Sequence, residues 1–462
     1  MPKPYARAVC WVRRDLRLRD HAALALATAR AERVAVAFVF DTAILDRLED
    51  RDDRRVTLIG RSLEEMDEGL RRVGSRLVVL RGDPVTAIPA LARELRADAV
   101  FAARDAEPYA RARDAAVAQT LDVPFETVKD AVVFEGAEMS DLLHRDFERE
   151  WRRRLVPERD LAYHHAGKAA LWPAEGLPTS DWNHGFAPSD LPLAPGERAA
   201  RERLKAFLPK LARYRGDRHR PDLEGTSRLS ADLRFGAISP RECVRAALAR
   251  RSSGADKWLS ELIWRDYYHA VLWHHPEAAT QPFRPVAAHG RESHLEAWRE
   301  GRTGYPLVDA AMRCLVATGL MPNRLRMVAA SFLTQGLLLD YREGERFFAR
   351  HLLDFDLASN NGGWQWCANA NADAPPFPRT LNPIVQSERF DPEGTLVRRW
   401  VPEVRELIGP ALHFPPRATP LELEAAGLIL GEGYPWPVVD LVEARHRRTH
   451  WLTMPTQKEP TA

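Results

Sequence analysis

The sequence is poor in cysteine and contains no long apolar run. Its four cysteines are scattered, with no CxxC pair and no histidine at ligand spacing, which argues against a disulfide framework and against a zinc site. They are Cys10, Cys243, Cys314 and Cys367. No apolar stretch is long enough to cross a bilayer, and arginines interrupt the apolar N-terminal segment within a few residues. We therefore expect no membrane association and a cytoplasmic, reducing environment.

The sequence also has little net charge and no complete set of metal ligands. Lysine and arginine number 67 against 65 aspartates and glutamates, a formal charge of +2, so a local basic groove would have to bind any polyanionic partner. His446 and His450 lie four residues apart on an expected helix without a third ligand, and we predict no metal site. With 462 residues, 45% of them hydrophobic, the chain is long enough for at least two packed cores.

The N-terminal part alternates between strand and helix patterns. Buried strands are expected at 8–12 and 34–40 and amphipathic helices at 20–29 and 56–73, and the alternation continues to about residue 134. The pattern predicts an α/β domain with a doubly wound, Rossmann-like parallel sheet over residues 1–132. The first strand leads into RRDLRLRDH and not into GxGxxG, so ordinary dinucleotide binding by this domain is unsupported. On local signals alone, this arginine-rich loop is as consistent with a solvated, salt-bridged turn.

The rest of the chain changes character twice. Residues 133–204 lose the alternation and become rich in proline and glycine, which indicates a long connector laid over the surface. Residues 205–462 are almost wholly helical in pattern. We therefore expect an α/β domain, a connector and an all-α domain.

Residues 340–383 carry more polar and aromatic residues than a structural helix needs. Their sequence is DYREGERFFARHLLDFDLASNNGGWQWCANANADAPPFPRTLNP. Asp354 and Asp356 precede Asn360, and two glycines then lead into Trp364 and Trp366. Glycines allow a flat ligand to approach the backbone closely. Local signals alone favour a different interpretation, a polar helix that ends at the glycines and is followed by two core tryptophans.

This stretch is similar, nearly residue for residue, to the flavin-binding signature of the photolyase and cryptochrome family, and the resemblance extends from WVRRDLRLRD to RRWVPEVREL. The pattern is closest to class I photolyases of cyclobutane pyrimidine dimers. The resemblance implies light-dependent repair of ultraviolet-damaged DNA, in which the reduced cofactor FADH⁻ passes an electron to a flipped-out dimer. The alternative is a blue-light photoreceptor of the cryptochrome type, without repair activity.

The segment TSRLS at 226–230 is the expected phosphate-binding part of the FAD site. Its hydroxyls and backbone N–H groups at a helix start suit a pyrophosphate, although Ser and Thr are also common as plain helix caps. The resemblance implies FAD contacts, over residues 205–462, from Tyr214, Thr226, Ser227, Arg228, Leu229, Ser230, Trp258, Arg326, Asp354, Phe355, Asp356 and Asn360. It also implies that Asp354 pairs with Arg326 and that Asp356 meets the polar edge of the isoalloxazine.

The helical segment KWLSELIWRDYYHAVLWHHP places Trp258, Glu261, Trp264, Arg265 and Tyr268 at helical spacing. An aromatic stripe of this kind is usually core packing, but an acid between two tryptophans would be buried and would need a partner or a function. In the family, the matching glutamate contacts the damaged base and the matching tryptophan stacks on it.

The segment TGYPLVDAAMRCLVATGLMPNRLRMVAASFL provides the residues that discriminate between lesions. Asn323 could hydrogen-bond a pyrimidine edge and Met327 could form an apolar wall. Family members that repair the pyrimidine (6-4) photoproduct carry histidine at both positions, and this chain carries the pair typical of cyclobutane dimer repair. Leu320 and Pro322 depart from the usual Trp and His, so the pocket wall would differ there.

The resemblance completes the predicted site. The catalytic residues would be Glu261, Asn323, Met327 and Asn360, where Asn in place of the Asp of plant cryptochromes favours the fully reduced flavin. Substrate and DNA would be bound by Arg218, Trp264, Arg265, Tyr268, Arg324, Trp366, Arg379 and Gln386. For electron transfer to the flavin, Trp364 matches the first of the family's three tryptophans, Tyr341 stands at the second position, and Ala288 and His289 lie near the third. Either the relay follows a different path, or cellular reductants keep the flavin reduced.

A second, antenna chromophore is left open. Tyr109 and Ala110 stand where folate-binding members carry an Asn-Glu pair, so methenyltetrahydrofolate is disfavoured, and 8-hydroxy-5-deazaflavin, FMN or an empty site remain. No protein partner is implied, and we expect a monomer.

Overall fold

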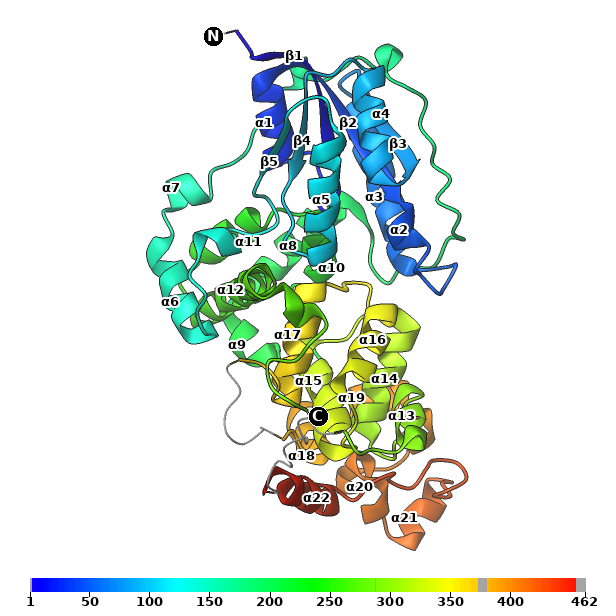
Figure 1. The fold of residues 1–462 in the computed structure, drawn as a ribbon. Coiled ribbons are helices and arrows are strands. Elements are labelled where there is room, and N and C mark those ends of the chain that lie inside the picture. The colour runs from blue at the N-terminus through cyan, green and yellow to red at the C-terminus, as the bar shows by residue number, and fades with distance from the viewer. Residues whose placement is uncertain (1, 287, 373–379, 454–462) are drawn as a thin grey trace, which may run out of the picture. The chain divides into compact units, whose positions relative to one another are not determined.

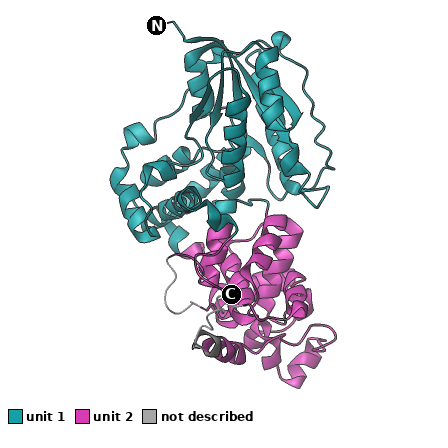
Figure 2. Ribbon diagram, in the orientation of Figure 1, with its two compact units in different colours: residues 1–215, 226–280, 353–359 teal, residues 216–225, 281–352, 360–462 magenta. Residues whose placement is uncertain are grey.

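The structure is a computed structural model that describes residues 2–286, 288–372 and 380–453. Contacts between Cα atoms divide it into two compact units (Figure 2). Unit 1 comprises residues 1–215, 226–280 and 353–359, and unit 2 comprises residues 216–225, 281–352 and 360–462. The predicted division into 1–132, 133–204 and 205–462 follows sequence pattern and stays a prediction.

Unit 1 contains a parallel sheet of five strands in the order β3-β2-β1-β4-β5 (Figure 1). The strands are β1 (Tyr5–Val12), β2 (Ala31–Asp41), β3 (Leu77–Gly82), β4 (Ala99–Ala103) and β5 (Phe125–Val128). The helices between them are α1 (Ala22–Arg30), α2 (Thr42–Leu45), α3 (Arg54–Arg71), α4 (Pro84–Glu94) and α5 (Pro108–Thr120). The order reverses at β1, and this confirms the doubly wound sheet that the alternating pattern predicts.

The sheet core shows why these segments are strands. Side chains from alternate positions of β1, β2 and β4, such as Trp11, Ala37 and Val100, form one buried cluster with Ile88 of α4 and Val117 of α5. Because both faces of a parallel sheet are covered, its strands are apolar at nearly every position. Residues 8–12 of β1 and 34–41 of β2 are accordingly all buried.

Unit 1 has further helices, and most of them contribute to a second core. They are α6 (His144–Arg154), α7 (Pro157–Asp160), α8 (Gly196–Phe207), α9 (Tyr214–Asp217, which runs on into unit 2), α10 (Ser230–Phe235), α11 (Pro240–Leu248) and α12 (Ser253–His274). Phe147 and Trp151 of α6 are buried in this core beside residues of α11 and α12. Helix α6 and most of α8 lie within residues 133–204, and both contribute to this core. The segment is therefore more than a surface connector.

Unit 2 is helical. Its elements are α13 (Glu292–Arg299), α14 (Pro306–Thr318), α15 (Asn323–Ser331), α16 (Tyr341–His351), the part of α17 (Leu357–Ala368) from residue 360, α18 (Pro383–Phe390), α19 (Thr395–Trp400), α20 (Gly409–His413), α21 (Pro420–Ala425) and α22 (Leu441–Thr453). Helix α17 continues through Gly362 and Gly363, so the interpretation in which the glycines end the helix is wrong.

The arginine-rich loop after β1 is salt-bridged, and apart from the exposed Arg19 its residues are buried or half-buried. Arg17 and Asp130 are buried and their side chains lie 2.6 Å apart, and Arg241 of α11 lies 2.8 Å from the same carboxylate. His21 lies 3.2 Å from Asp15, and both are buried. A buried charge must be paired, and here each arginine has an acid. The solvated-turn interpretation is therefore right about the salt bridges and wrong about exposure for most of the loop.

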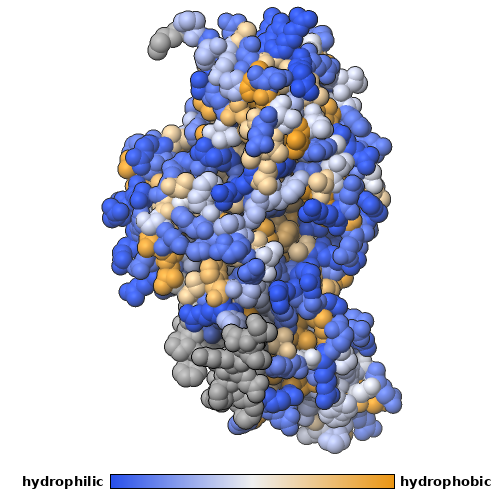
Figure 3. All heavy atoms as spheres, viewed as in Figure 1, coloured by the Kyte–Doolittle hydropathy of each residue, from blue (hydrophilic) through white to orange (hydrophobic). Residues whose placement is uncertain are grey.

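The surface is polar on the side in view. Hydrophilic residues dominate the face shown in Figure 3, with smaller hydrophobic areas between them. None of the helices within 2–286, 288–372 and 380–453 combines the length and the apolar character needed to cross a membrane.

Candidate functional site

The predicted phosphate-binding segment lies in unit 1 just before α10. Leu229 occupies the N-cap position of this helix, so a plain Ser or Thr cap does not explain the sequence. Arg228 has φ of +53°, a left-handed conformation that is unusual for a residue with a side chain. Thr226 and Ser227 are half-buried, and Ser230 is exposed at the first helical position. The chain is thus held in an unusual turn where a phosphate is expected.

The aromatic and acidic residues predicted to share a helix all lie on α12. Trp258 is buried and packs edge-to-face on Phe207, as does Tyr214. Glu261 is half-buried, with its carboxylate 2.8 Å from the Lys257 ammonium. The sequence predicts a fully buried Glu261, and the structure shows it half-buried. The reason is that Lys257, one turn earlier on the same helix, pairs with its carboxylate at the surface.

Trp264 and Arg265 of α12 have partners that sequence reasoning did not foresee. The indole of Trp264 stacks face-to-face on the imidazole of His144 and lies beside Tyr268. The guanidinium of Arg265 donates to the backbone carbonyls of Ala131 and Leu233, the second over 3.3 Å. Burial lowers the pKa of Arg265. These contacts tie Arg265 to the interior of unit 1, which does not favour the predicted contact with DNA.

The acids of the segment Asp354–Phe355–Asp356 are buried in unit 1. The carboxylate of Asp356 accepts hydrogen bonds from Arg14 over 2.6 Å and from Arg234 over 3.4 Å, and lies 3.4 Å from His269. His269 and these arginines hold the pKa of Asp356 well below its usual value, against the opposing effect of burial. Asp356 is therefore an anion with several cationic partners. Pairing of Asp354 with an arginine of α15 stays a prediction.

Helix α15 in unit 2 brings the lesion-discriminating residues together. The Nδ2 of Asn323 lies 3.7 Å from the Sδ of Met327, one turn along the helix. Asn323 is exposed and Met327 is half-buried, so an amide and an apolar thioether are presented side by side. Leu320 is half-buried before the helix, and Pro322 is its N-cap residue.

Arginines gather beside this helix. Arg324 donates to the Oε1 of Gln386 over 3.3 Å and lies 2.9 Å from the Nδ1 of His219. Its pKa is lowered by burial and by the nearby charges of Arg218 and Arg389. Clustered cations that repel one another attract phosphate. Arg389 was missed because it lies 65 residues from Arg324 in the sequence, and Arg379 lies outside the described residues. Arg326 donates to the carbonyl of Met321 over 2.7 Å.

Helix α16 contributes an acid that the sequence did not single out. The amide of Asn361 donates to the carboxylate of Glu345 over 3.0 Å, and Asn360 donates to the Glu345 carbonyl over 3.2 Å. Burial raises the pKa of Glu345 to about 7, although the Asn361 hydrogen bond acts in the opposite direction. The predicted catalytic Asn360 is therefore fixed through the backbone of a glutamate that titrates near neutral pH.

Trp364 of α17 has aromatic neighbours in unit 2. Its ring lies 4.9 Å from Phe348 and 6.1 Å from Trp298, measured between centroids and edge-to-face in both cases. A Cβ on Gly344 would clash with the Trp364 ring, so the glycine admits the indole. Tyr341 is buried, its hydroxyl has no hydrogen-bond partner among the described residues, and burial raises its pKa to about 12. Trp298 was missed because only its tertiary contact distinguishes it from a core residue.

The backbone of α17 fits a flat cofactor. Among the residues that the structure describes, and apart from the chain neighbours and the backbone of the same helix, no atom lies within 4 Å of the position that a Cβ on Gly363 would take. Neighbouring polar side chains from the same helix are the buried Asn360 and Asn361, and Trp366 is half-buried one turn on. An open glycine backbone beside amide groups is compatible with the ring of FAD.

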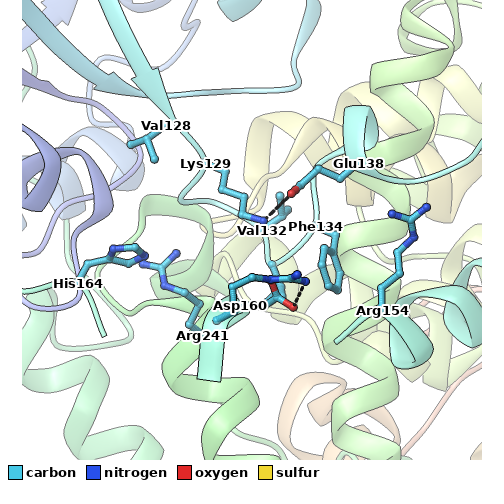
Figure 4. Close-up of a pocket in the computed structure, with 11 residues that line it drawn as sticks. Val128, Lys129, Val132, Phe134, Glu138, Arg154, Asp160, His164 and Arg241 are labelled. Atoms are coloured by element: carbon cyan, nitrogen blue, oxygen red, sulfur yellow. Dashed lines mark hydrogen bonds and ion pairs between the residues drawn. The ribbon is translucent and has the colours of Figure 1, made fainter. Parts of the chain in front are cut away.

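A separate cavity of about 490 Å³ lies in unit 1 (Figure 4). Val128, Val132 and Phe134 line it together with charged side chains. The charged groups are paired as Lys129–Glu138, Arg159–Asp160, Arg241–Asp130 and Arg154–Glu150. Because each cation already has an acid, we assign no ligand to this cavity.

The antenna and metal predictions concern other parts of the chain. The hydroxyl of Tyr109 donates to Asp41 over 2.8 Å, and burial raises its pKa to about 12. Ala110 is buried. In the described portion of the chain, no three His, Cys, Asp or Glu side chains are grouped to hold a metal ion. The side chain of His450 lies outside the described residues.

Comparison with known proteins identifies relatives over most of the chain. The family model described as DNA photolyase matches residues 8–156, and the model described as FAD binding domain of DNA photolyase matches residues 258–453. A deoxyribodipyrimidine photo-lyase of Synechococcus is 37% identical over 93% of both chains. Two similar solved structures are a class III photolyase from Agrobacterium tumefaciens (TM-score 0.87, 31% identity, 97% of both chains) and a cryptochrome from Synechocystis (TM-score 0.84, 27% identity, 97% of this chain and 100% of that one).

Proposed function

We propose, from the premise that this chain belongs to the DNA photolyase family, that it is a deoxyribodipyrimidine photo-lyase that splits cyclobutane pyrimidine dimers in light. The fold does not distinguish repair from photoreception, since one similar structure is a cryptochrome. The observation that carries the proposal is the adjacency of Asn323 and Met327 on α15. A photoreceptor has no need of an amide and a thioether set to receive a pyrimidine pair. Membership of class I stays a prediction.

FAD is the proposed cofactor. The segment 226–230 and Tyr214 would contact the phosphates, and Trp258, Asp354, Phe355, Asp356 and Asn360 the rest of the molecule. The chemistry that bound, reduced FAD would supply is light-driven donation of one electron to the dimer, with return of that electron once the cyclobutane ring has opened. Gly363 supports the proposal because no other described segment fills the space where its Cβ would be. Asp356 is already ionised and ion-paired, so it would present an acceptor and not a proton donor.

The chain's own residues would bind and orient the lesion. A dimer inside a duplex must be flipped out, which costs a few kcal/mol and less where damage has weakened pairing. Trp264 and Trp366 would stack on it, each with about 1–3 kcal/mol. Glu261 would hydrogen-bond the base, and its ion pair with Lys257 holds the carboxylate in place until then.

Phosphates flanking the lesion would be bound by the cationic cluster. Arg324, Arg218 and Arg389 support this assignment because burial and mutual repulsion lower the pKa of Arg324, and a phosphate would relieve that repulsion. Gln386 holds the Arg324 guanidinium. Arg379 remains a further candidate, and binding should weaken as salt is raised.

Other features stay predictions. Trp364 would pass electrons to the cofactor, with Tyr341 or the adjacent Trp298 as the next member. A monomer, a cytoplasmic location and the identity of any antenna rest on the sequence reasoning alone.

The experiment is repair of an oligonucleotide with one thymine dimer by the purified protein, reduced with dithionite. We expect the two thymines to be restored in blue light and not in darkness. A preparation that binds reduced FAD and restores none would favour the photoreceptor. Glu261→Gln keeps the side-chain volume and removes the carboxylate, so it is the matched control for a site-dependent reaction.

A further inference from the structure

His144 and Trp264 form the closest aromatic stack in the described structure. Their ring centroids lie 3.3 Å apart and their planes differ by 7°. His144 is the first residue of α6 and Trp264 lies in the middle of α12. Tyr267 packs edge-to-face on both rings, at 5.2 Å from the imidazole and 5.6 Å from the indole. The imidazole thus covers one face of the indole, and a base could stack only on the other.

The imidazole is neutral under physiological conditions. Burial lowers the pKa of His144 to about 4, and Lys257 acts in the same direction, whereas Glu148 and Glu261 oppose it. Of these three charged groups, Glu148 lies on the histidine's own helix, with its carboxylate 4.0 Å from the His144 Nε2, and Lys257 and Glu261 lie on α12. The stack is therefore a contact of two neutral rings near pH 7, and phenylalanine could reproduce it.

We propose that His144 is a positioning residue for the dimer, which fixes the indole of Trp264 so that its opposite face is presented to the flipped-out base. The inference rests on the proposed function, because it assigns Trp264 to the lesion. Among the described residues of unit 1, His144 alone stacks face-to-face on this indole, whereas Tyr267 lies edge-on and Tyr268 is tilted. Aromatic pairs contribute about 0.5–1.5 kcal/mol beyond the area they bury, so loss of the stack should cost about 2- to 13-fold in dimer binding.

The test is a comparison of His144→Phe with His144→Leu in the full-length protein with FAD bound. Both variants fill the space, but only phenylalanine keeps a ring against the indole. The measured quantity is the ratio of dissociation constants for undamaged and thymine-dimer oligonucleotides, determined in darkness by fluorescence anisotropy. We expect His144→Phe to stay within twofold of the wild type and His144→Leu to lose about 2- to 13-fold of the ratio.

A double-mutant cycle separates positioning from general packing. Trp264→Ala should lower the ratio by itself, and adding His144→Leu should lower it no further, because the ring to be positioned is gone. Equal ratios for the leucine variant and the wild type would overturn the proposal. So would additive losses in the double variant. A wild-type protein that does not distinguish dimer from undamaged DNA would overturn both this inference and the proposed function, whereas the first two results would leave the function standing.

Discussion

Glu345 should titrate near neutral pH, and this can be tested without light or DNA. Its pKa of about 7 stands against an ordinary value of 4.5. The difference between these two pKa values corresponds to about 3 kcal/mol by which the fold disfavours the charged carboxylate. The pKa of Glu345 is higher in the folded protein than in the unfolded chain. The contribution of its protonation to folding stability is therefore present in full below about pH 4.5 and is lost as pH rises through about 7.

Two substitutions change this titration in different ways. Glu345→Gln mimics the protonated acid and does not titrate. As pH rises from 5 to 8.5, its stability relative to that of the wild type should therefore increase by about 2.5 kcal/mol. Asn361→Ala removes the amide that donates to the carboxylate, so it should raise the midpoint above that of the wild type.

The assay is infrared titration of the protonated carboxyl band, with denaturant unfolding at the same pH values. We expect a band that is half-lost near pH 7, that is missing from Glu345→Gln and that persists to higher pH in Asn361→Ala. If no band of the wild type between pH 5 and 9 depends on Glu345, burial does not disfavour its charge and the reasoning is wrong.

The other predictions concern packing, phosphate binding and repair. Gly344→Ala should destabilise the protein by about 1–3 kcal/mol in thermal unfolding, because a methyl group would clash with Trp364; unchanged stability would contradict that packing. Gly363→Ala is its matched control in open space, and should gain up to about 1 kcal/mol as a helix residue while retaining less FAD on gel filtration; full retention would show that the cofactor does not approach there. Arg324→Ala should lower the slope of log affinity against log salt by about 0.9 in titrations with DNA, and an unchanged slope would mean that it contacts no phosphate. Glu261→Ala should reduce the repair rate per bound FAD by at least about tenfold, the cost of a hydrogen bond to a charged group; repair at the wild-type rate would remove Glu261 from the site.

Local patterns were sufficient where a feature depends on chain neighbours. Alternating strands and helices specify a parallel sheet because crossover connections allow few topologies. Asn323 and Met327 are four residues apart on a helix, so their contact follows from helical geometry. Glu261 of α12 also lies where its spacing indicates, although Lys257, one turn before it, keeps the carboxylate at the surface.

Tertiary contacts could not be predicted in this way. Glu345 lies in no recognisable motif, and its pKa is raised by burial in the fold, against the opposing hydrogen bond from Asn361. Arg265 has the same sequence appearance as a DNA-binding arginine, but backbone carbonyls of distant segments accept its hydrogen bonds. His144 lies in a segment expected to be a connector, and only the packing of α6 on α12 brings it to Trp264.

The central claim is that this protein repairs cyclobutane dimers in light. The most direct measurement gives the reduced protein two oligonucleotides in one blue-light assay, one with a cyclobutane thymine dimer and one with a (6-4) photoproduct, and follows restoration of thymine by chromatography. Because Asn323 and Met327 stand where (6-4) repairers carry histidine, we predict restoration of the first substrate alone, and only in light. Repair of the second substrate, or of neither by a protein with reduced FAD bound, would contradict the account.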